Sequence, residues 1–188
     1  MQIIIFAALA LVSAQPPSAA PAPASPTSIA GFDEDARCII EATSAPDRSE
    51  IATIAVRPEL RESSTAYPRL IQRGAECGRR NGWSPSRSSQ VGTYAVATIL
   101  RDEYRVQLRA AGIDVAIVDA WFESLSDELR LNVFEESNAA AIGEQVRALE
   151  ARNVIPTARL AAAGHMIGGY IAALSMVERA RRGVPLVN

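Results

Sequence analysis

Apolar side chains recur every three or four residues along most of the chain after residue 32, and no segment alternates apolar and polar residues over the length of a strand. This spacing places apolar residues along one face of a helix. It therefore predicts an all-α fold, an orthogonal or up-and-down bundle of about six or seven helices. Caps, prolines and glycines set the predicted helices at Asp33 to about Ala45, Asp47 through Val56, Pro68 to Asn81, Ser84-Pro85 to about Ala111, Asp114 through Val133, Asn138 to about Arg152, and Pro156 to Arg182.

Several predicted helix starts rest on polar residues that can accept a hydrogen bond from the first helical turn. Asp33 is interpreted as the N-cap of the first helix, and Asp47 with Glu50 has the spacing of a capping box. Ser126-Asp127-Glu128 can restart a helix, so the segment that begins at Asp114 is either one continuous helix or two.

The start of the chain predicts export. Ile3–Val12 is an apolar run of the length typical of a secretory signal, and Val12-Ser13-Ala14 supplies the small residues for cleavage after Ala14. Residues 15–28 are almost only Pro, Ala, Ser and Thr, a composition that cannot bury a core. We therefore expect a signal peptide at 1–14, a disordered tether at 15–28 and a single helical domain at 29–188, in a protein of the bacterial periplasm or cell envelope.

The chain has two cysteines, Cys38 and Cys77. In an oxidising compartment an isolated pair favours a disulfide, whereas a redox-active pair usually has the C-x-x-C spacing, which is missing here. Closing a loop of about 40 residues is worth roughly 4 kcal/mol in the chain-entropy model. We expect the disulfide to join the first helix to the third.

The last predicted helix contains Leu160–Val177, in which the one strongly polar side chain is His165. It is either a transmembrane helix or a central bundle helix surrounded by other helices. We favour the bundle helix, because the amphipathic helices before it need an apolar partner. We then expect the helix to be the most buried one, with Gly164 and Gly168 where another helix approaches closely, and with His165 buried and hydrogen-bonded.

His165 is the only histidine. A zinc or copper site would need more imidazole or thiolate ligands, and no acidic cluster has the loop spacing of a calcium site, so we predict neither a metal nor a cofactor. No G-x-S-x-G motif presents a nucleophilic serine. If the bundle holds a pocket, His165, Tyr170 and the neighbouring glycines are the candidate ligand-binding residues.

The formal net charge is −2, which gives no electrostatic case for binding nucleic acid. Export, helical patterning and the missing catalytic motif favour a non-enzymatic binding or structural protein, whose partner would be an envelope protein or a small molecule. Two alternatives remain open: a small envelope enzyme that uses His165 with a carboxylate, and an inner-membrane subunit with a transmembrane helix at 160–177.

Overall fold

The structure, a computed structural model, describes residues 31–133, 140, 143–144 and 157–184. The predicted signal peptide and tether, residues 1–28, lie outside the described residues. The helix predicted from Asn138 to about Arg152 lies almost entirely outside them as well.

Within the described residues the chain is helical and contains no strand, so the predicted all-α class is confirmed. The helices of the described ranges are α1 (Phe32–Ala42), α2 (Ala45–Val56), the 3₁₀ turn η2 (Pro58–Leu60), α3 (Ala66–Asn81), α4 (Pro85–Ala110), α5 (Val115–Ser124), α6 (Asp127–Leu131) and α8 (Thr157–Arg181).

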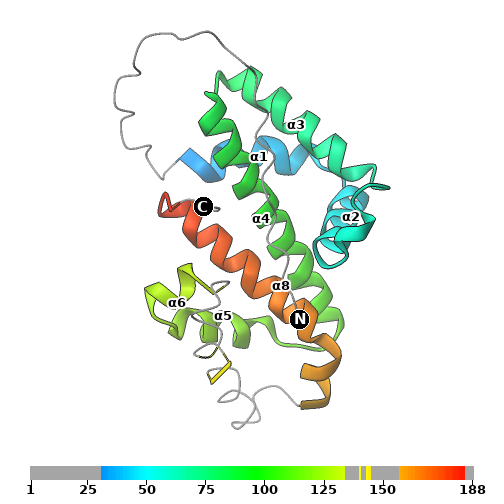
Figure 1. The fold of residues 1–188 in the computed structure, drawn as a ribbon, viewed down its shortest axis with the longest axis vertical. Coiled ribbons are helices and arrows are strands. Elements are labelled where there is room, and N and C mark those ends of the chain that lie inside the picture. The colour runs from blue at the N-terminus through cyan, green and yellow to red at the C-terminus, as the bar shows by residue number, and fades with distance from the viewer. Residues whose placement is uncertain (1–30, 134–139, 141–142, 145–156, 185–188) are drawn as a thin grey trace.

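The two long helices α4 and α8 lie side by side and run in opposite directions through the molecule (Figure 1). Two contacts fix this antiparallel arrangement. Arg181, at the end of α8, lies 6.0 Å from the ring centroid of Tyr94 in the first half of α4. Near the other end of α4, Arg105 donates a hydrogen bond to the hydroxyl of Tyr170. The core is built around this pair.

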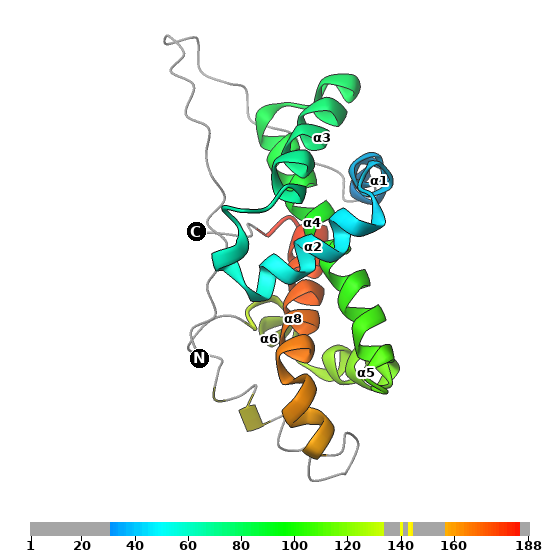
Figure 2. The ribbon, with the colours of Figure 1, turned by 90° about the vertical axis from the view of Figure 1, so that its right-hand side faces the viewer.

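The shorter helices pack along the α4–α8 pair. The three helices α1, α2 and α3 all contact α4, while α5 and α6 contact α8 (Figures 1 and 2). The Tyr104 hydroxyl joins α4 to α2 by donating a hydrogen bond to the Ala52 carbonyl oxygen at 3.2 Å. α2 therefore reaches the second half of α4, next to Arg105, whereas α1 meets the first half of α4, where the Tyr94 hydroxyl donates to Asp33.

Local sequence signals explain several helix boundaries. Ser84 caps α4 by accepting a hydrogen bond from the backbone of Arg87, with Pro85 in the first turn as predicted. Gly82 ends α3 with a φ of 65°, a left-handed conformation that favours glycine. Ser126 caps α6, which confirms two helices rather than one continuous helix after Asp114.

The two acidic caps predicted for α1 and α2 are wrong. α1 begins after Gly31, and the Asp33 carboxylate instead accepts a hydrogen bond from the Tyr94 hydroxyl. α2 is capped by Ser44, whose side chain accepts from the backbone of Asp47. Both carboxylates have partners on other helices, and these tertiary contacts replace the local bonds that the sequence spacing indicated.

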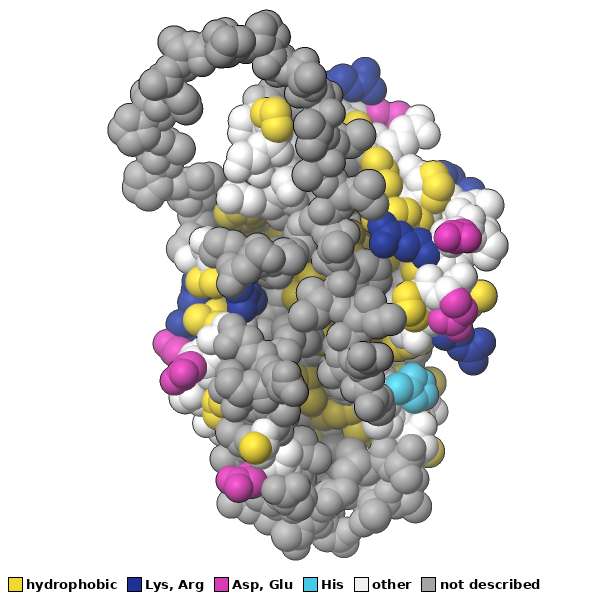
Figure 3. Space-filling model, viewed as in Figure 1, with side chains coloured by type: hydrophobic (Ala, Val, Ile, Leu, Met, Phe, Trp, Pro, Cys, Tyr) yellow, Lys and Arg dark blue, Asp and Glu magenta, His cyan; other side chains and the backbone are white. Residues whose placement is uncertain are grey.

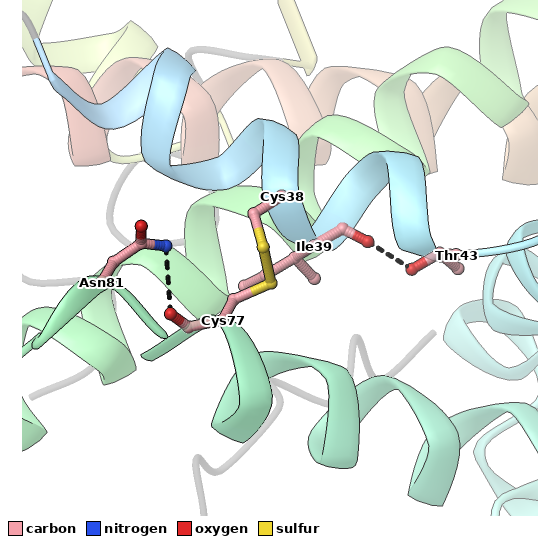
Figure 4. The surroundings of a disulfide bond; sticks show 5 residues. All are labelled: Cys38, Ile39, Thr43, Cys77 and Asn81. Carbon is pink, nitrogen blue, oxygen red and sulfur yellow. Dashed lines mark hydrogen bonds between the residues drawn. A yellow bond between two sulfur atoms is a disulfide. The ribbon is translucent and has the colours of Figure 1, made fainter. Parts of the chain in front are cut away.

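A disulfide joins Cys38 of α1 to Cys77 of α3, with their Cα atoms 6.1 Å apart (Figure 4). This is the predicted pairing of the first and third helices. Cys77 is buried, whereas Cys38 is partly exposed. Among the described residues, no helix combines the length and the hydropathy that crossing a membrane requires.

Candidate functional site

The two candidate ligand-binding residues of α8 lie in different environments. His165 is exposed, and the cyan side chain at the surface in Figure 3 is this single histidine. Tyr170 is 0% exposed. Five residues at about 100° each separate the two positions by roughly 140° around the helix axis, so they do not share a face. The expectation that His165 is buried is therefore wrong.

The glycines of α8 also differ from expectation. A Cβ atom added at Gly164 or Gly168 would meet nothing within 4 Å, so neither marks a close helix contact. The close approach lies at Gly169, where a Cβ atom would come within 2.6 Å of the Tyr104 ring. With Ala162, His165 and Gly168 exposed, α8 is not surrounded by other helices on all sides.

Tyr170 belongs to a polar cluster that joins three helices. Its hydroxyl donates a hydrogen bond to Asp119 Oδ1 of α5 at 2.5 Å, and it accepts from Arg105 of α4 through Nε at 3.2 Å and Nη2 at 2.8 Å. Arg105 Nη2 also lies 3.2 Å from Asp119 Oδ2. We refer to Arg105, Asp119 and Tyr170 as the Arg105 cluster.

The electrostatics of the Arg105 cluster keep Tyr170 protonated. Burial of the ring, together with the hydrogen bond that it donates to Asp119, raises the pKa of Tyr170 to about 12. At neutral pH the hydroxyl is therefore a fixed donor to the carboxylate and a fixed acceptor for the guanidinium. The side chains of Arg105 and Asp119 are 33% and 32% exposed, so a cation and an anion reach solvent side by side.

The Arg105 cluster suits recognition better than covalent chemistry. It holds no serine, cysteine or histidine that a neighbouring base could activate. Within the described part of the chain, no group of three or more His, Cys, Asp or Glu side chains could hold a metal ion. What the cluster offers is one guanidinium and one carboxylate held rigidly between α4, α5 and α8.

Sequence reasoning named Tyr170 but missed Arg105 and Asp119. One signal was available for Asp119, because it is the one ionisable side chain within the apolar stretch Val115–Phe122 of α5. A carboxylate in such a stretch usually has a partner on a neighbouring helix. Nothing in the local pattern identified Arg105 as that partner.

A second polar cluster, also missed, joins α2 to α3. Asp47 is 3% exposed, and its carboxylate accepts hydrogen bonds from Arg69 and from Arg73, the latter at 2.8 Å. The hydrogen bonds from Arg69 and Arg73 hold the pKa of Asp47 well below its usual range. Because the Asp47 carboxylate is buried and fully engaged, we assign this cluster a structural role.

Searches of protein-family models, of curated proteins and of solved structures found no match to this chain.

Proposed function

We propose that this chain is an exported protein of the bacterial periplasm or cell envelope that acts by binding a partner. The observation that carries the proposal of export is the Cys38–Cys77 disulfide, because such bonds persist in oxidising compartments and are rare in the reducing cytosol. Export is also supported by the apolar run Ile3–Val12 and the small residues Val12-Ser13-Ala14.

The Arg105 cluster supports binding as the mode of action. Its guanidinium and carboxylate are each about one-third exposed and are held by a buried tyrosine hydroxyl rather than by flexible loops. A rigid charged pair loses little conformational entropy when it meets a ligand, which favours recognition of a polar partner. The partner would be an envelope protein or a small molecule that carries charge of either sign.

Intact-mass measurement tests export. The full chain is expressed in a Gram-negative host, and the protein of the periplasmic fraction is weighed before and after thiol alkylation under non-reducing conditions. We expect a mass that begins at or close to Gln15 and no alkylation of Cys38 or Cys77. A mass that retains Met1–Ala14, or two alkylated thiols, would contradict the proposal.

Site-specific photo-crosslinking tests binding. A benzophenone side chain replaces Arg109, which is exposed one helical turn after Arg105, and in a control it replaces Gln72, which is exposed on α3. In the envelope fraction we expect a defined adduct from position 109 that disappears with Arg105→Gln, provided that circular dichroism shows a folded variant. Adducts of equal yield from both positions, or from neither, would contradict a binding role for the Arg105 cluster.

A further inference from the structure

The helix α3 buries little apolar surface for its length. It has 16 residues, and apart from the disulfide-bonded Cys77 its one large buried apolar side chain is Leu70. Ile71, next in sequence, is 54% exposed. α3 also lies at the periphery of the molecule in both ribbon views (Figures 1 and 2). Apolar burial alone therefore holds this helix weakly.

Polar contacts and one covalent bond supply much of the remaining attachment. The Asp47 carboxylate of α2 accepts from Arg69 and Arg73 near the start and middle of α3. Toward its end, the disulfide from Cys77 to Cys38 is the one covalent link between α3 and α1 (Figure 4). Between these points Gly74 faces Ile39 of α1, because a Cβ atom added at Gly74 would lie 3.9 Å from Ile39 Cδ1.

In contrast, α1 is held to α4 without the disulfide. It buries Phe32, Ala36 and Ile39. Its first turn is fixed by the hydrogen bond from Tyr94 to Asp33 and by the ion pair between Arg87 and Asp35 at 2.5 Å. Opening the disulfide therefore removes a main attachment of α3 and only one of several attachments of α1.

We propose that the Cys38–Cys77 disulfide is a redox-controlled latch, and that its reduction by a dithiol releases α3 from α1 while α1, α4, α5 and α8 stay folded. Cys38 is the more accessible of the two residues, because it is partly exposed and Cys77 is 3% exposed. A thiolate of the dithiol attacks the Cys38 sulfur, the S–S bond breaks, and Cys77 leaves as a thiolate that takes up a proton.

The second thiol of the reductant then completes the exchange. Its thiolate attacks the mixed disulfide on Cys38, Cys38 leaves as a thiolate and is protonated, and the reductant becomes a cyclic disulfide. Two electrons and two protons thus pass from the dithiol to the protein. The release uncovers Ile39 of α1, which Gly74 of α3 faces and which is 1% exposed in the oxidised form. This latch is independent of the binding function proposed above.

Hydrogen–deuterium exchange with mass spectrometry tests the latch on the full chain, oxidised and after incubation with dithiothreitol. We expect amides of residues 66–81 to exchange roughly 10- to 1,000-fold faster in the reduced form, the upper bound being set by the loop-closure entropy of the opened ring. Amides of α5 and α8 keep their rates. The variant Cys38→Ser/Cys77→Ser should reproduce the reduced pattern without reductant, and dithiothreitol should not change it further.

The other outcomes overturn the proposal. Acceleration of all helices together, or a double-serine variant that fails to fold, would show that the disulfide is a global cross-link rather than a local latch. Unchanged exchange in residues 66–81 after complete reduction, verified by alkylation of both thiols, would show that apolar and ionic contacts suffice to hold α3.

Discussion

α3 and α5 are both peripheral helices that contact α4, but different forces attach them. α5 has 10 residues and buries a cluster of large apolar side chains, namely Val115, Val118, Trp121 and Phe122. α3 has 16 residues and relies on Leu70, the disulfide and the buried carboxylate of Asp47. Covalent and ionic cross-links therefore occur in this fold where a helix contributes little to the core, as they do in small exported domains whose cores are insufficient.

The largest expected effect comes from truncating the core under α5. Trp121→Ala should lower the free energy of unfolding by about 3 kcal/mol, because it leaves a cavity in the core. This cost lies toward the lower end for such changes, because the buried indole Nε1 has no hydrogen-bond partner within the described structure and its removal relieves the cost of that unpaired group. Urea denaturation followed by circular dichroism measures it. Ile71→Ala on α3, a truncation at a 54% exposed position, is the control and should cost less than about 0.5 kcal/mol. Equal costs would refute the contrast between the two helices.

A smaller effect separates two adjacent glycines of α8. Gly169→Ala should cost about 1–3 kcal/mol, because its Cβ would lie 2.6 Å from the rigid ring of Tyr104. Gly168→Ala, which meets nothing within 4 Å, should be neutral or stabilising by up to about 1 kcal/mol through helix propensity. Thermal unfolding of both variants compares them. If Gly169→Ala stabilised the protein, the Tyr104 ring would have to shift without cost, which would contradict a tight α4–α8 contact at this position.

Low pH should weaken the attachment of α3 to α2 through Asp47. Hydrogen bonds from Arg69 and Arg73 lower the pKa of Asp47, so its stabilising contribution is complete above the ordinary aspartate pKa of about 3.9 and is lost as pH falls toward the lowered value. Asp47→Asn should lower the melting temperature at pH 7 by roughly 3–6 °C and flatten its decline below about pH 4. Glu41→Gln, an exposed carboxylate on α1, serves as the control and should leave both unchanged. An unaltered acid slope in Asp47→Asn would contradict the assignment.

The smallest effect concerns α6, which follows α5 and buries no side chain of its own. Arg182, which directly follows α8, forms an ion pair with Asp127 of α6 at 2.7 Å. The Asp127 side chain is 61% exposed, compared with 5% for Asp47. Arg182→Ala should lower the melting temperature by no more than about 2 °C in low salt, and the difference should vanish near 1 M NaCl, where the Debye length is about 3 Å. The effect of Asp47→Asn should persist at that salt concentration. If both effects are screened alike, the two ion pairs do not differ as their burial indicates.

Much of the fold was predictable from the sequence because helix boundaries are set locally. Ser84-Pro85, Gly82 and Ser126 start or end helices through bonds to backbone groups a few residues away. The structure places the Ser84-Pro85 start as predicted, and at Ser126 it decides between the two alternatives that the sequence left open. The candidate site was predictable only in part. Tyr170 was named, whereas Arg105 lies 65 residues away in the chain and no local pattern connects the two.

The sequence by itself determined the helical periodicity, the caps that depend on neighbouring residues and the one cysteine pairing that two cysteines allow. Only the tertiary structure decided which polar groups meet. Asp33 and Asp47, which were expected to cap helices, instead bond to Tyr94 and to two arginines, respectively. His165 lies at the surface. The physical reason is range: a cap bonds within one helical turn, whereas a buried carboxylate or a close glycine contact depends on which distant helix packs against it.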